Sequence, residues 1–173
     1  MEGLRLSEET TRTLAGVAGA TLLGLRSLQG DASSGWLVAE TSIGLLVAVP
    51  ESCSIDLGDP RAEYFRLTVR PTQLEPQQSQ WPGGPLQKWL TLNDIPSGAL
   101  PAMVLSAAPV TGQCGLGSGH SGIELSLSSG FRVSVLSEAP SLSPLALQVT
   151  WHRQPPRLVP NNSFKPNPLR GSA

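Results

Sequence analysis

The sequence has few charged residues and no marked excess of either sign. Charged residues make up 14% of the 173, and the formal net charge is −1. The usual share of charged residues in a soluble domain is about a quarter. Because proteins that bind nucleic acid or acidic membrane surfaces carry strongly basic surfaces, this balance gives no reason to expect either partner. We therefore expect no nucleic-acid partner and no membrane partner.

Cysteine and histidine are also scarce. The cysteines are Cys53 and Cys114, which form no Cys-x-x-Cys pair, and the histidines are His120 and His152. A structural zinc site needs several such ligands at short, regular spacings. We therefore expect no metal site, and we interpret the two cysteines as small thiols in a reducing compartment.

The chain lacks an apolar run long enough to cross a membrane. The stretch 14–25 is apolar, but a transmembrane helix needs about 20 such residues. Its length suits the apolar part of a signal peptide, yet the residues before it include three glutamates and two arginines. A signal peptide begins with a basic segment instead. We therefore predict a cytoplasmic protein.

Glycine and proline are abundant, with 18 and 16 residues, which suits short strands joined by turns. The clearest pattern is in GIELSLSSGFRVSV, residues 122–135. Apolar residues alternate with polar ones before and after the turn Ser128–Gly130, which predicts a β-hairpin. The alternating apolar residues are Ile123, Leu125, Leu127, Phe131, Val133 and Val135.

An earlier stretch, WLVAETSIGLLVAV at 36–49, repeats this pattern. In this alignment Ser42 matches Ser128, Gly44 matches Gly130, and Val47 and Val49 match Val133 and Val135. We predict an α+β fold, mainly antiparallel β, with an internal duplication of a helix–strand–hairpin–strand unit around a shared sheet system. Chance similarity between short strands is the alternative.

The remaining pattern completes one β-rich domain over residues 1–153. Ser7 is suited to cap a short helix, and Pro85 to begin a second one that reaches about Leu92. The two repeats would span 7–70 and 85–152, with a proline-rich linker at 71–84 and a disordered tail at 154–173. Further strands are expected at 20–28, 54–57, 64–70, 102–107 and 146–151, and a Gly/Ser loop at 111–121.

The last thirteen residues, NNSFKPNPLRGSA, resemble the read-through translation of the recombination site of a mobile-integron gene cassette. This resemblance implies that the gene travels as a cassette in bacteria, and it implies nothing about the chemistry of residues 1–153. A basic solvated tail is the alternative. The body, through hairpins such as IELSLSSGFRVSV, resembles uncharacterised bacterial β-rich immunity-type proteins, a resemblance that implies a protein partner.

The segment 113–122, QCGLGSGHSG, is the main candidate for a binding loop. Phosphate-binding loops need glycines that open a helix after a strand, and here a strand follows. The G-x-S-x-G elbow of hydrolases and the pyrophosphate loop of acetyltransferases are both incomplete. We therefore predict no catalytic residue and no cofactor. The segment is either a flexible connector or a binding loop that uses Gln113, His120 and Ser121.

Three further residues are candidates for binding. Glu40 is expected in the middle of a strand beside Trp36, where it would either line a pocket or face outward into solvent. Trp81 lies in the proline-rich linker, where it would either plug the fold or anchor a partner.

We predict a non-catalytic bacterial defence or immunity protein that binds a phage or toxin component. One alternative is a small antibiotic-modifying or other enzyme, since integron cassettes often carry resistance genes. A second alternative is a subunit of a homo-oligomeric assembly that pairs through exposed edge strands.

Overall fold

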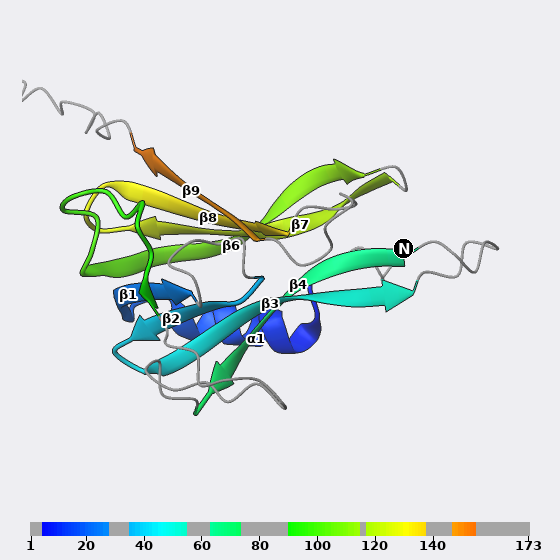
Figure 1. Cartoon of the computed structure of the whole chain (residues 1–173), viewed down its shortest axis with the longest axis horizontal. Coiled ribbons are helices and arrows are strands. Elements are labelled where there is room, and N and C mark those ends of the chain that lie inside the picture. Colours follow the sequence, from blue (N-terminus) through cyan, green and yellow to red (C-terminus); the bar gives the residue numbers. More distant parts are fainter. Residues whose placement is uncertain are drawn as a thin grey trace, which may run out of the picture.

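The computed structural model describes residues 5–27, 35–54, 63–73, 90–114, 117–137 and 147–154. Within these ranges the chain forms one helix and nine strands, and all strand pairs are antiparallel, which confirms the predicted fold class (Figure 1). The elements are α1 (Glu8–Val17), β1 (Thr21–Ser27), β2 (Leu37–Thr41), β3 (Gly44–Ser54), β4 (Glu63–Thr72), β5 (Leu90–Thr91), β6 (Ala102–Cys114), β7 (Gly117–Leu127), β8 (Phe131–Ser137) and β9 (Leu147–Arg153).

Two four-stranded meanders make up the sheet. The strand order is β4-β3-β2-β1-β6-β7-β8-β9, and β5 pairs with β1 beside this path. The meanders join where β1 meets β6, through the pairs Thr21–Met103 and Leu22–Ala102. They form two layers, so that β4 contacts β7 and β8 although it lies far from them in the strand order (Figure 1).

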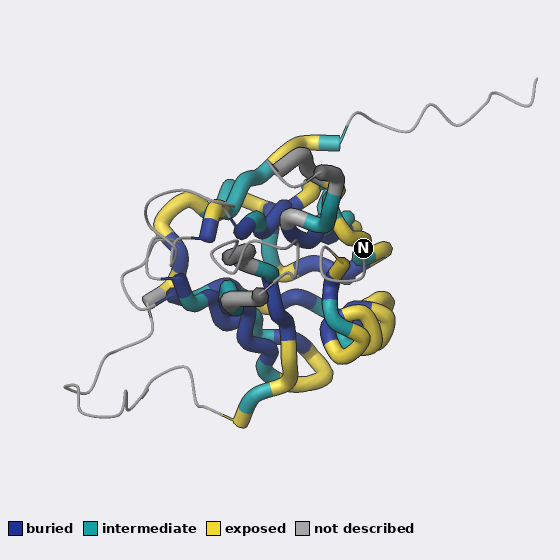
Figure 2. Tube along the Cα trace, turned by 90° about the vertical axis from the view of Figure 1, so that its right-hand side faces the viewer, coloured by how far each residue is buried: buried dark blue, intermediate teal, exposed yellow. Residues whose placement is uncertain are grey.

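The core lies between the two layers, where alternating side chains of both meanders meet. Leu22, Leu67, Val104, Leu127 and Val133 are at most 1% exposed. Figure 2 shows the buried stretches gathered in the middle of the molecule, with exposed ones around them. In the hairpin at 122–135, the alternation that predicted the strands therefore also identified their buried face.

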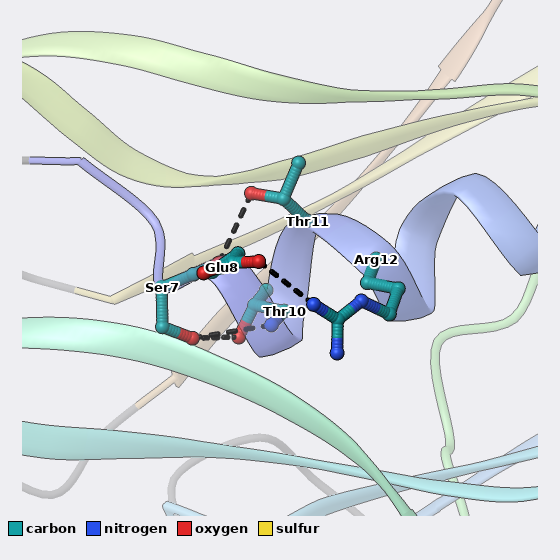
Figure 3. Close-up of polar contacts among 5 residues, drawn as sticks. All are labelled: Ser7, Glu8, Thr10, Thr11 and Arg12. Carbon is teal, nitrogen blue, oxygen red and sulfur yellow. Dashed lines mark hydrogen bonds and ion pairs between the residues drawn. The ribbon is translucent and has the colours of Figure 1, made fainter.

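Helix α1 begins where Ser7 caps it. The Ser7 hydroxyl accepts a hydrogen bond from the Thr10 amide at 3.1 Å, and Glu8 in the first turn forms an ion pair with Arg12 at 2.7 Å (Figure 3). A carboxylate in the first turn is favoured by the helix dipole. Thr10, Leu14 and Val17 form the buried face of the helix, at the spacing of an amphipathic helix.

The buried threonine of α1 also binds the edge of the sheet. The Thr10 hydroxyl, which is 0% exposed, accepts a hydrogen bond from the Val69 amide of β4 at 3.1 Å. It also accepts one from the Ser7 hydroxyl at 2.9 Å. β4 lies at one end of the strand order and is therefore an edge strand. The bond to Thr10 covers part of this edge, which would otherwise be open to other strands.

The two meanders agree in detail. β1 and β6 each contain a bulge at the corresponding place, where Leu23 and Leu105 are the extra residues opposite β2 and β7. Bulges of this kind are specific features of a fold, because they interrupt the ladder at one position. Their agreement supports the internal duplication, which stays a prediction.

The turns of the two hairpins are also fastened in the same way. Ser42 Oγ accepts a hydrogen bond from the Thr21 amide, and Ser128 Oγ accepts one from the Met103 amide, both at 2.9 Å. In return, the amides of Ser42 and Ser128 donate to the carbonyl oxygens of Thr21 and Met103. Each serine therefore ties its turn to the first strand of its meander.

The predicted alignment of the hairpin at 36–49 with the hairpin at 122–135 is wrong by one residue after these turns. The β2–β3 turn has two residues between the pair Thr41–Gly44, whereas three residues separate Leu127 from Phe131. Because a shift of one residue exchanges the two faces of a strand, Leu46 and Ala48 join Val133 and Val135 in the core. The valines at 47 and 49 lie on the outer face instead.

Several predicted boundaries are also wrong. Pro50 does not end the first hairpin, because β3 continues to Ser54 as one strand. The pairs of β2 with β3 reach only Ala48, so Pro50 lies where β3 has a strand partner on one side, as in an edge strand. The strand predicted at 54–57 is the end of β3 at Ser54, and the rest of it lies outside the described residues.

The middle of the chain was predicted less well. β4 runs to Thr72, so the first two residues of the predicted linker belong to a strand. The predicted helix from Pro85 is wrong at its end, because Leu90 and Thr91 form β5. The ranges 74–89 and 155–173, which include most of the linker, the start of that helix and the tail, lie outside the described residues.

We expect that replacing Thr10 by valine lowers the free energy of unfolding by about 1–3 kcal/mol, since the Val69 amide would stay buried without its acceptor. The matched control is Thr11→Val, because Thr11 is exposed and its hydroxyl donates to the Ser7 carbonyl of the same helix. There we expect a change within about 0.5 kcal/mol. Urea denaturation of both variants measures the difference, and equal losses would contradict the role of the Thr10–Val69 bond.

Candidate functional site

The predicted loop at 111–121 is wrong, because β6 and β7 extend through it. Thr111 pairs with His120 and Gln113 with Ser118, with residues 115 and 116 outside the described part of the hairpin. Strand pairing is made by the backbone, and therefore it needs none of the alternating apolar side chains that this segment lacks. The candidate residues Gln113, His120 and Ser121 thus lie on strands.

His120 has a structural contact. Its Nδ1 atom accepts a hydrogen bond from the Leu6 amide at 3.0 Å, and the side chain is half-buried. The bond joins β7 to the segment that precedes α1, across 114 residues of sequence. Together with the hydrogen bond from Val69 of β4 to Thr10, it fixes the start of α1 to both meanders.

A second bulge shapes the strand around His120. The pairing changes register between Val110–Gly122 and Thr111–His120, so that Ser121 is the extra residue on β7. Gly122 approaches β8 closely, because a Cβ there would overlap the carbonyl oxygen of Val135 and lie 2.8 Å from Leu136 Cα. The glycine thus permits a close strand contact beside the bulge.

Glu40 faces outward, as in the second of its two interpretations. Its carboxylate forms an ion pair with Arg26 Nε at 2.9 Å on the outer face of β1 and β2. The side chain crosses over Gly24, where an added Cβ would lie 3.0 Å from Glu40 Oε2. The glycine therefore leaves room for this ion pair.

Trp36 lies on the outer face of the first meander. It is half-buried and packs with Leu45 against the buried valines Val38, Val47 and Val49. Trp81 lies outside the described residues. The structure thus brings Trp36 and Glu40 to one face of the first meander, whereas His120 belongs to the second.

A small apolar cavity lies in the core. Its volume is about 40 Å³, and it is lined by side chains of α1 and both meanders, including Leu14, Leu25 and Val133. An apolar cavity of about 150 Å³ is needed to hold a molecule the size of benzene. We therefore interpret this cavity as a packing gap and not as a ligand site.

Two further findings concern the described residues. They contain no group of three or more His, Cys, Asp or Glu side chains arranged to hold a metal ion. None of the helices formed by these residues has both the length and the apolar character needed to span a bilayer.

A surface feature that was not predicted is an apolar patch of Leu23, Ile43, Met103 and Leu105. These side chains are 44–61% exposed. Leu23 and Leu105 are the extra residues of the two corresponding bulges, and Met103 lies opposite Thr21 where the meanders join. Ile43 lies in the turn that Ser42 fastens to Thr21.

The sequence contained a signal for this patch. In MVL (103–105) and in the pair Leu22–Leu23, large apolar residues are consecutive and therefore break the alternation of a half-buried strand. Consecutive apolar residues place one side chain in the core and the next on the outer face.

The contact of His120 makes a testable prediction. Replacing His120 by alanine should lower the free energy of unfolding by about 1 kcal/mol, because the Leu6 amide would lose its acceptor. His152→Ala is the matched control, since His152 is exposed on β9. Denaturant titration of both variants measures the effect, and a His120→Ala variant as stable as the control would exclude the structural role.

The sequence of this chain matches no protein-family model, and no curated protein or solved structure matches it either. The function of the apolar patch has therefore to be inferred from its geometry.

Proposed function

We propose that this chain is a non-catalytic binding protein whose recognition surface is the apolar patch of Leu23, Ile43, Met103 and Leu105. The observation that carries this proposal is the exposure of four large apolar side chains around one junction of the sheet. Single exposed apolar residues are common, but clusters of them on a soluble protein usually mark an interaction site.

The arrangement of the patch supports a contact with another protein. Leu23 and Leu105 lie two residues beyond the pair Thr21–Met103, in opposite directions along the antiparallel strands. Strands lie about 4.8 Å apart and rise about 3.4 Å per residue, so Leu23 and Leu105 are about 14 Å apart, and Met103 lies between them at about 7–8 Å from each. They alternate with the buried Leu22 and Val104 and therefore point to the outer face of the sheet.

The backbone around the patch is fixed before any partner binds. The strands that carry Thr21 and Met103 are each fastened by a serine of a hairpin turn, through one side-chain and one backbone hydrogen bond. A surface that needs no ordering loses less conformational entropy on binding. This favours recognition of a partner by a preformed surface.

We further propose that the partner is a phage or toxin component in the cytoplasm of a bacterium. The support is the C-terminal NNSFKPNPLRGSA, whose resemblance to a translated cassette site implies a mobile bacterial gene. A non-catalytic defence or immunity protein acts by binding a target, and an exposed apolar patch suits a protein target.

This function predicts a phenotype for the double variant Leu23→Ser/Leu105→Ser. The wild-type chain, expressed in a phage-sensitive bacterium or together with a toxin, should protect the cells. The double variant should lose most of that protection, because serine removes apolar contact area without adding charge. Plating efficiency on a phage panel and survival with a toxin panel are the measurements.

The matched control is Ala15→Ser, at an exposed position on the outer side of α1. Thermal unfolding of all variants confirms that each is folded. Protection that survives in the double variant would exclude the patch as the recognition surface. A wild-type chain that protects against no phage and no toxin would contradict the defence role.

A further inference from the structure

The last strand of the sheet, β9, offers an open edge. It pairs with β8 through seven consecutive residue pairs, from Phe131–Arg153 to Ser137–Leu147, with no change of register. It ends the strand order, and on its other side it pairs with none of the residues that the structure describes (Figure 1). We propose that this edge pairs antiparallel with β9 of a second copy of the chain.

The two edge strands of the sheet, β4 and β9, differ in how far they are protected from pairing with another strand. At β4, the amide of Val69 donates to Thr10 of α1, so that the helix covers part of the edge. β9, with the sequence LQVTWHR, has no lysine, proline or bulge, which are the usual devices that stop edge strands from pairing. Its backbone donors and acceptors are therefore suited to a further strand.

The sequence of β9 is complementary to itself in one register. An antiparallel pair centred on Thr150 places Val149 of each copy opposite Trp151 of the other, and Gln148 opposite His152. Pairs of an aromatic and a β-branched residue are among the more favourable cross-strand pairs. Arg153 faces Leu147, and therefore no like charges are opposed. This register overlaps all seven residues and is symmetric, as a two-fold dimer requires.

The burial of β9 agrees with such a pair. Val149 and Trp151 pack against the core but remain half-exposed, so a second β9 would cover them. On the outer face, Thr150 is half-buried, and Gln148 and His152 are exposed. The apolar side chains of two copies would therefore meet on one face and the polar ones on the other, as the alternation of strands requires.

The segments that flank β9 in the sequence are poorly suited to pair with this edge. Pro140 and Pro144 precede β9, and Pro155 and Pro156 follow it. Proline lacks the amide that a ladder needs, so the sequence of these segments disfavours seven consecutive pairs. The β9 strand of a second copy contains no proline and has the required length.

The test uses a charge at the centre of the symmetric pair. Thr150→Lys opposes two ammonium groups across the dimer axis, and it should weaken dimerisation about tenfold or more. Thr150→Glu should act in the same way, and an equal mixture of the two variants should restore the dimer. Sedimentation equilibrium or light scattering over a range of concentrations measures the mass.

Ala108→Lys is the matched control, because Ala108 lies on the exposed outer face in the same cross-strand row, which runs through Glu124 and Ser134 to Thr150. Its mass should equal that of the wild type. A monomeric wild-type chain would overturn the proposal, and so would a dimer that Thr150→Lys leaves intact or that Ala108→Lys weakens equally.

Disulfide cross-linking determines the register of the proposed β9 pair. In a chain with Cys53→Ser and Cys114→Ser, Thr150→Cys should form a disulfide-linked dimer under mild oxidation, since directly opposed strand residues have Cα atoms about 4.5–5.5 Å apart. Gln148→Cys should not, because its symmetric copy lies four residues away. Cross-linking at 148 and not at 150 would overturn the proposed pairing. The result is independent of the phage and toxin assays.

Discussion

Two residue pairs, Thr21 with Met103 and Leu22 with Ala102, join the meanders into one sheet. The Val104 backbone adds two hydrogen bonds, accepting one from the Gly19 amide and donating one to the Ala20 carbonyl, both 2.8 Å long. Because so few pairs connect the halves, each meander can fold over its own side of the core and bring β4 against β7 and β8. The same junction determines where the patch lies, since the bulges with Leu23 and Leu105 follow directly after it.

The fold could be predicted from the sequence where the pattern of side chains differs between strands, turns and helix ends. The hairpin at 122–135 follows from alternation, and the start of α1 follows from Ser7 and its acidic neighbours. The β6–β7 extension was missed because glycine and serine can pair through the backbone without any apolar pattern. The alignment of Val47 with Val133 was wrong because one extra turn residue moves the buried face to Leu46, which residue identity does not reveal.

The candidate site was predictable only in part, since each side chain depends on contacts distant in sequence. An outward-facing position was one of two interpretations of Glu40, but its partner Arg26 is fixed by the pairing of β1 with β2. His120 was predicted to lie in a loop, whereas its contact with Leu6 depends on how α1 approaches β7. The outer faces of the two meanders also carry different side chains at positions where the backbones of the two meanders correspond. Val38 corresponds in register to Glu124, which lies near Ser134 and Arg132 in a polar group.

The two proposed surfaces are compatible within one molecule. In the strand order, β7 and β8 separate the patch at the β1–β6 junction from the edge at β9. A dimer through β9 would therefore leave both copies of the patch accessible and would connect them through one continuous sheet. Two rigidly linked sites bind a partner with repeated subunits more tightly than either site alone, provided that their spacing matches. A weak contact of four apolar side chains would then suffice for a repetitive target, whereas a monomeric target would need further contacts around the patch.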